Sequence, residues 1–186
     1  MKPILVDISH SLISSEQLMR LATAIWRDPV AARRAGESAV RYWRGQAASK
    51  GPFYLIRDAN GRDLGLIGAF WHADKSPVVG LRWSGVIPDC RSQGVYRAAI
   101  SSLVEILQSL CPNGQWLEEM VPPGRSDVIP VFESLGFEDW GMIRGDDPHF
   151  ERGTRMRLPI NGTPLRYYEV GKGSVDRYEV IHPRHA

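Results

Sequence analysis

One stretch of the chain constrains the fold more than any other, because it joins a strand to a long helix through a proline and a glycine. Residues 78–87 are rich in strand-forming side chains and end at Pro88. After Gly94, an apolar stripe of helical period continues for about 17 residues, and residues 116–121 again have strand character. A strand-helix-strand unit of this length forms a right-handed crossover, which makes its two strands parallel. The sequence therefore predicts a mixed α/β fold.

The rest of the chain adds strands and helices on both sides of this unit. Ser14 and Gln17 have the spacing of a capping box, and Asp28 followed by Pro29 is a typical helix start. The expected strands are 4–8, 53–57, 64–71, 78–87, 116–121, 137–143 and 152–158. The expected helices begin at Ser14, at Asp28 (ending near Ala48), at Gly94, and at a Ser126 cap (ending at Leu135).

The bulk composition excludes several classes of protein. The 186 residues are 43% hydrophobic and carry a formal net charge of +2, so the chain can bury a core and has no overall attraction to nucleic acid or to an anionic membrane. No apolar stretch approaches about 18 residues, and the first residues lack a signal-peptide core. We therefore expect a cytoplasmic protein outside the membrane. The histidines include no H-E-x-x-H pair, although His182 and His185 lie close together, and we expect no metal site.

The segment between the proline and the helix has the features of an anion site. A helix begins with about four backbone N–H groups that lack a partner within the helix, and it carries about half a positive charge there. Gly94 allows a ligand to approach the backbone because it has no Cβ. We therefore expect this turn to hold a phosphate group.

Two motifs in the chain resemble those of the GCN5-related N-acetyltransferase (GNAT) family. Val86, Ile87, Pro88, Arg91 and Gly94 match the family's signature V-x-P-x-x-(Arg/Gln)-x-x-Gly-x-(Gly/Ala), which leads into a long helix. Residues 131–137, Val-Phe-Glu-Ser-Leu-Gly-Phe, are similar to the family's helix end before a closing strand. The resemblance covers about residues 4–158, where the order of elements also matches.

The resemblance implies a GNAT-like central sheet with splayed parallel strands and flanking helices, and it implies acetyl-CoA or another short acyl-CoA as cofactor. It assigns the contacts with acyl-CoA to Val86, Ile87, Arg91, Ser92, Gln93, Gly94, Val95, Tyr96 and Arg97. The implied function is an acyl-CoA-dependent N-acyltransferase, in which an amine attacks the thioester directly. The acceptor is a small-molecule amine or an amine of a protein or peptide.

Glu118 and Glu119 are the candidate catalytic residues. An alkyl amine has a pKa of about 10, so a base must remove a proton before the amine attacks. Because neighbouring strand residues face opposite sides, we expect only one of the two glutamates to face the acceptor. In the alternative interpretation, both are ordinary surface carboxylates.

Two positions depart from the family pattern. Tyr96 stands where the family keeps a small residue, and Phe132 stands where the family often has a tyrosine that protonates the departing thiolate. Phenylalanine cannot donate a proton. Tyr96 or solvent then supplies the proton, or the chain is a non-catalytic module that binds acyl-CoA.

Two further regions remain open in function. The arginines at 33, 34, 41 and 44 form either a solvated helix face or, less favoured, a surface for RNA. Residues 161–186 contain two β-prone runs around a glycine turn, which predicts an extra hairpin after an acyltransferase domain at 1–160. That hairpin packs on its own domain, covers a substrate cleft or forms a homodimer interface.

Overall fold

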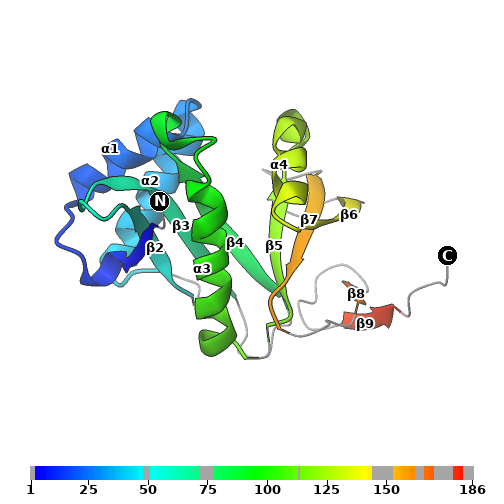
Figure 1. Ribbon diagram of the computed structural model, residues 1–186. Coiled ribbons are helices and arrows are strands. Elements are labelled where there is room, and N and C mark those ends of the chain that lie inside the picture. The colour runs from blue at the N-terminus through cyan, green and yellow to red at the C-terminus, as the bar shows by residue number, and fades with distance from the viewer. Residues whose placement is uncertain are drawn as a thin grey trace. The chain divides into compact units, whose positions relative to one another are not determined.

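The computed structural model describes residues 3–47, 51–71, 78–112, 114–143, 153–161, 166–169 and 178–181. The main sheet has the strand order β1-β2-β3-β4-β5-β7-β6, and helices flank it (Figure 1). This mixed α/β architecture confirms the predicted fold class. The chain divides into two compact units, Met1–His72 with Gly80–Ser109, and Ala73–Val79 with Leu110–Ala186.

The first unit begins with β1 (Ile4–Asp7), α1 (Ser15–Ile25) and α2 (Pro29–Trp43). The predicted capping box is confirmed, since Ser14 Oγ accepts from the backbone N–H of Gln17 at 3.1 Å while the Gln17 side chain accepts from the Ser14 N–H at 2.8 Å. The predicted end of α2 near Ala48 is wrong. The helix ends at Trp43, because Gly45 adopts a φ of +69° that breaks the helical path. Ala48 itself lies outside the described residues.

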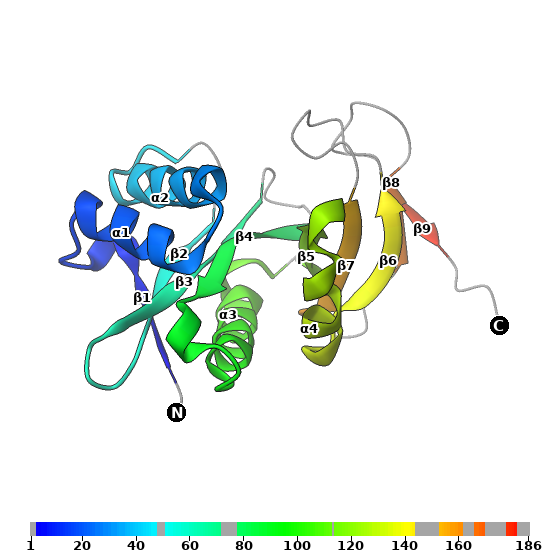
Figure 2. The same ribbon diagram turned by 90° about the horizontal axis from the view of Figure 1, so that it is seen from above.

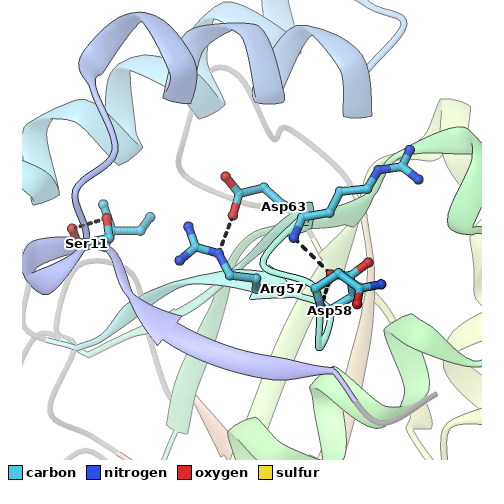
Figure 3. A network of polar contacts seen from close by, with 7 residues as sticks. Ser11, Arg57, Asp58 and Asp63 are labelled. Atoms are coloured by element: carbon cyan, nitrogen blue, oxygen red, sulfur yellow. Dashed lines mark hydrogen bonds and ion pairs between the residues drawn. The ribbon is translucent and has the colours of Figure 1, made fainter.

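Strands β2 (Phe53–Arg57), β3 (Asp63–Phe70) and β4 (Val78–Val86) continue from β1 as an antiparallel meander. The turn between β2 and β3 is held by Asp58, whose Oδ1 accepts from the N–H groups of Asn60 and Arg62, each at 2.9 Å (Figure 3). Next to it, Arg57 Nε donates to Asp63 Oδ1 at 2.8 Å (Figure 3). These contacts fix the hairpin that the Asn-Gly pair predicts.

Helices cover both faces of this meander (Figure 2), with α1 and α2 on one face and α3 (Val95–Leu110) on the other. The face under α1 and α2 is a core of aliphatic and aromatic side chains that includes Ile8, Leu18, Phe53, Leu55 and Leu66, all with no exposed surface. On α3, the apolar stripe that the sequence predicts becomes buried at Ala99, Ile100, Leu103 and Leu107.

The second unit is built on β5 (Trp116–Val121), β7 (Gly153–Pro159) and β6 (Glu138–Ile143), with β7 antiparallel to both neighbours. The predicted Ser126 cap is wrong. A 3₁₀ segment with non-helical backbone at Arg125 spans Pro123–Val128, and α4 (Ile129–Ser134) follows it with Val128 at its N-cap and no side-chain capping bond. Gly136 ends this region at a φ of +93°, as the sequence predicts.

The C-terminal residues form a separate antiparallel pair, β8 (Arg166–Glu169) with β9 (Tyr178–Ile181). This confirms the two extra strands, whereas the glycine turn expected between them at 171–174 lies outside the described residues. The division into domains at residue 160 stays a prediction.

Truncation of the buried stripe of α3 should destabilise the protein. Leu107 is fully buried, whereas Leu110 on the same helix is 52% exposed. We expect Leu107→Ala to lower the free energy of unfolding by about 2–5 kcal/mol, because it leaves a cavity in the core. Leu110→Ala, the matched control, should change it by about 0.5 kcal/mol or less. Urea unfolding measures both, and equal losses would contradict this packing of α3.

Candidate acyl-CoA site and catalytic carboxylates

The connection from β4 to α3 is an exposed loop with an unusual backbone. Ser92 and Gly94 both have positive φ, 60° and 74°, and the loop enters α3 where the Ala98 N–H donates to the Gly94 carbonyl at 3.0 Å. A Cβ built on Gly94 would meet no atom within 4 Å. The loop therefore presents backbone and open space at the start of a 16-residue helix, where an anion is favoured.

Arg91 ties this loop to two elements of the first unit. Its guanidinium donates to the Ile25 carbonyl from Nη2 at 2.8 Å and to the Val86 carbonyl from Nε at 3.4 Å. Ile25 ends α1 and Val86 ends β4, so one side chain ties the loop to both elements. The sequence predicted a contact of Arg91 with acyl-CoA, and the structure adds a role for its guanidinium in positioning the loop.

A β-bulge interrupts β4 just before the loop. Gly68 pairs with Arg82 and Leu66 with Gly85, so Trp83 and Ser84 on β4 together oppose Ile67 on β3. Trp83 has a positive φ of 31° and packs edge-on against Trp26, with ring centroids 5.9 Å apart. Bulges leave a ladder position unpaired and redirect side chains, and they are common next to active sites.

Glu118 on β5 is held in a buried ion-pair cluster. Its Oε2 lies 2.7 Å from Nη2 of Arg157 and 3.1 Å from Nε of Arg155, two arginines of β7 on the same face. Arg157 is fully buried, and its guanidinium lies over the ring of Trp140 at 4.4 Å. A carboxylate that neutralises buried arginines is a structural group, because loss of its charge would leave them uncompensated.

Glu119 faces the opposite side of β5, in register with Met156 of β7. Burial, together with the negative charge of Glu118 as the smaller cause, raises the pKa of Glu119 to about 8. A carboxyl group with this pKa exchanges its proton near neutral pH, as a general base must. Of the two predicted carboxylates, Glu119 is the one whose pKa lies near neutral pH, and its catalytic role stays a prediction.

Phe132 on α4 is buried and packs against Phe137, with ring centroids 5.1 Å apart at 70°. The position at which the family often has an acidic hydroxyl is thus part of the apolar packing of the second unit.

Among solved structures, similar folds come from acetyltransferases. The ribosomal-protein-S18-alanine N-acetyltransferase of Escherichia coli aligns with a TM-score of 0.60 and 18% identity, over 90% of this chain and 99% of that chain. A spermidine N-acetyltransferase chimera from Vibrio cholerae and hSSAT aligns with a TM-score of 0.63 and 12% identity, over 84% and 96%. An acetyltransferase of the GNAT family from Staphylococcus aureus aligns with a TM-score of 0.63 and 12% identity, over 86% and 99%.

The chain has the GNAT fold. At these identities the likeness establishes the fold, and it confirms the resemblance that the two motifs indicate. No model of a known family matches the sequence, and no curated protein does.

Within this GNAT fold, the structure brings the predicted cofactor residues together in one loop. Val86 and Val95 are buried supports at its two ends, whereas Ser92, Gln93, Gly94 and Arg97 are exposed. Glu118 and Glu119 belong to the second unit. The sequence missed the bulge at Trp83 and Ser84, because a bulge depends on strand register, and it missed the pairing of Glu118 with Arg155 and Arg157.

Other parts of the described chain carry fewer indications of function. Within the described ranges, no group of three or more His, Cys, Asp or Glu side chains is arranged to hold a metal, and His182 and His185 fall outside them. No helix in the part of the chain that the structure describes is long and apolar enough to cross a membrane. On α2, Arg33 Nε pairs with Glu37 at 2.8 Å, so the arginine face is mixed in charge.

Neutralising Glu118 should destabilise the protein. We expect Glu118→Gln to lower the free energy of unfolding by about 3–5 kcal/mol, because it removes the counter-charge of the buried Arg157. Glu105→Gln, on the exposed face of α3, is the matched control and should cost about 0.5 kcal/mol or less. Chemical denaturation measures both. A Glu118→Gln protein as stable as the control would show that the ion pairs contribute little.

Proposed function

We propose that this chain is an acyl-CoA-dependent N-acyltransferase that transfers an acetyl group from acetyl-CoA, or another short acyl group, to an amine. The observation that carries the proposal is the open loop at Gly94, which leads into α3 within a GNAT fold. Acyl-CoA would supply an activated thioester, so the chain itself needs to bind, orient and move protons.

The loop fits the pyrophosphate of acyl-CoA by shape and by charge. The space in front of Gly94 is where a side chain would otherwise stand, and the helix start favours negative charge. We assign the phosphate contacts to the backbone of Ser92, Gln93, Gly94, Val95 and Tyr96, with Arg97 as a nearby exposed cation. Arg91 keeps this backbone in place through its two carbonyl contacts.

The end of β4 is the proposed support for the acyl arm. By resemblance, the backbone at Val86 and Ile87 pairs with the pantetheine. Because a bulge leaves a ladder position unpaired, we assign to this bulge a backbone N–H that stabilises the oxyanion where charge develops.

Glu119 is the proposed general base. Its pKa of about 8 lets it take a proton from the acceptor amine at slightly alkaline pH, directly or through water. Glu118 contributes by raising that pKa through its charge, and its ion pairs with Arg155 and Arg157 fix its position.

The acceptor is a primary amine, of a small molecule or of a protein or peptide. Structural neighbours include enzymes named for both kinds of acceptor, spermidine and an alanine of ribosomal protein S18. We also propose a cytoplasmic protein that forms a homodimer. One structural neighbour, a spermidine N-acetyltransferase from Vibrio cholerae, is described as dodecameric, so proteins of this fold do form oligomers.

Substitutions at Gly94 test the cofactor site. Asp and Asn have the same shape and both tolerate positive φ, so Gly94→Asp and Gly94→Asn differ only in charge. We expect both to weaken acetyl-CoA binding, and Asp to weaken it by about tenfold more than Asn, because the added carboxylate repels phosphate at the helix start. Calorimetry measures the two dissociation constants. Affinities equal to that of the wild type in both folded variants would remove the proposed site.

Glu119→Gln tests the base. With acetyl-CoA and a panel of alkyl amines, we expect wild-type kcat to rise with pH up to about 8, as Glu119 loses its proton. The variant should lose about 100-fold or more at pH 8, and the loss should shrink as pH approaches the pKa of the amine. Release of free thiol is the assay, and calorimetry controls for acetyl-CoA binding.

The outcomes of that experiment also separate the two candidate functions. Phe132, buried and unable to donate a proton, is the observation that favours a non-catalytic acyl-CoA-binding module. Tight acetyl-CoA binding by the wild type without thiol release over the amine panel would establish that alternative.

A further inference from the structure

We propose that the groove between α1 and α2 binds a small organic phosphate, a phosphomonoester with an apolar body, through Arg41 and Arg44. The two helices lie side by side in the first unit (Figure 2), and a cavity of about 550 Å³ opens between them. A cavity of this volume is large enough for a small molecule. None of the residues that line it belongs to the proposed acyl-CoA loop.

The groove has an apolar part and is closed at one end by tight helix packing. Met19 of α1 and Val40 of α2 line it and are both partly buried, so an apolar body that contacts them loses surface to water. A Cβ built on Gly36 would lie 2.5 Å from the Met19 sulfur, which means that the two helices approach closely there. The α2 side of the groove begins after Gly36 and continues to the end of that helix.

Both carboxylates of the groove form ion pairs along their own helices with arginines that do not line it. Glu16 Oε1 lies 3.5 Å from Nη1 of Arg20, and Glu37 Oε1 lies 2.8 Å from Nε of Arg33. The hydrogen bond from Arg33 is the main cause of the lowered pKa of Glu37. These pairs offset the negative charges, so the groove keeps the positive charge of the two further arginines at the end of α2.

Arg41 and Arg44 are exposed and lie three residues apart, as neighbours on one face of the helix. Within the part of the chain that the structure describes, neither side chain forms an ion pair. The pKa of Arg82 on β4 is lowered mainly by burial and in smaller part by the charge of Arg41, so a third positive charge lies near this end of α2.

A phosphomonoester matches this set of donors better than a carboxylate does. It carries a charge of about −1.5 to −2 at pH 7 and three acceptor oxygens, and arginine can bind two of them in parallel. A carboxylate would offset the charge of only one of the two arginines. The hydroxyl of Ser15, on the α1 side of the groove, is a further donor.

NMR of the full chain with ¹³C-labelled methionine methyl groups tests the site, with phenyl phosphate, benzoate and benzylamine as probes. We expect phenyl phosphate to shift the Met19 signal with a dissociation constant of about 1 mM or below. Met156, fully buried in the second unit, should not respond. Benzoate should bind about tenfold more weakly, and benzylamine should not bind, because of their charges. Either probe binding as tightly as phenyl phosphate would overturn the assignment to a phosphate.

Arginine variants test the charge balance of the groove. We expect Arg41→Gln and Arg44→Gln each to weaken phenyl phosphate binding by about fivefold to tenfold. Arg33→Gln should also weaken it, although Arg33 does not line the groove, because Glu37 would lose its partner. Arg34→Gln is the matched control, since it removes the same charge from α2 outside the groove, and should change the affinity by less than about twofold. Losses as large in the control would overturn the site.

Two further variants separate this groove from a charged surface and from the cofactor loop. Val40→Ala should weaken phenyl phosphate by about threefold and leave the binding of inorganic phosphate unchanged, because only the ring contacts Val40. Equal effects on both ligands would overturn the apolar subsite. Gly94→Asp, which we expect to weaken acetyl-CoA binding, should leave the Met19 response intact. A response lost in Gly94→Asp would assign the phosphate to the loop instead of the groove.

Discussion

The backbone path from β4 into α3 is the constraint on which the candidate cofactor site depends. Two residues with positive φ, Ser92 and Gly94, bend the chain so that α3 begins beside the end of β4, with its first N–H groups next to open space. Positive φ is costly for a serine, so the surroundings must hold it. Arg91 does this by bonding carbonyls of α1 and β4 at once. The shape of the loop, the start of α3 and the end of β4 therefore depend on one another.

Strand geometry places the two neighbouring glutamates of β5 in different environments. Successive side chains point to opposite faces, so Glu118 and Glu119 meet different environments although they share a peptide bond. On one face, Glu118 forms ion pairs with Arg155 and Arg157. On the other, burial and the charge of Glu118 raise the pKa of Glu119 to about 8. The carboxylate that pairs with these arginines is thus also one cause of the raised pKa of the candidate base.

The two departures from the family motif, at Phe132 and Tyr96, both concern whether the side chain carries a hydroxyl. Phe132 is committed to apolar packing with Phe137, so that position has no proton to give. Tyr96 carries a hydroxyl that the motif lacks, and a β-bulge places Ser84 against it. Relative to the motif, a hydroxyl is thus missing at Phe132 and added at Tyr96.

The sequence by itself determined the order of elements, most of their bounds and the nature of the β4–α3 connection. These follow from local rules: the capping box at Ser14, the hairpin at Asn60 and Gly61, and the apolar stripe that buries Leu103 and Leu107. Two local rules gave wrong predictions. Val128, not Ser126, is the N-cap of α4, and Gly45 ends α2 earlier than the sequence pattern predicts. Only the tertiary structure decided which glutamate is paired, where the bulge lies and what Tyr96 contacts. Each depends on strand register and on neighbours distant in sequence, such as Arg157 for Glu118, and no local pattern encodes such pairs.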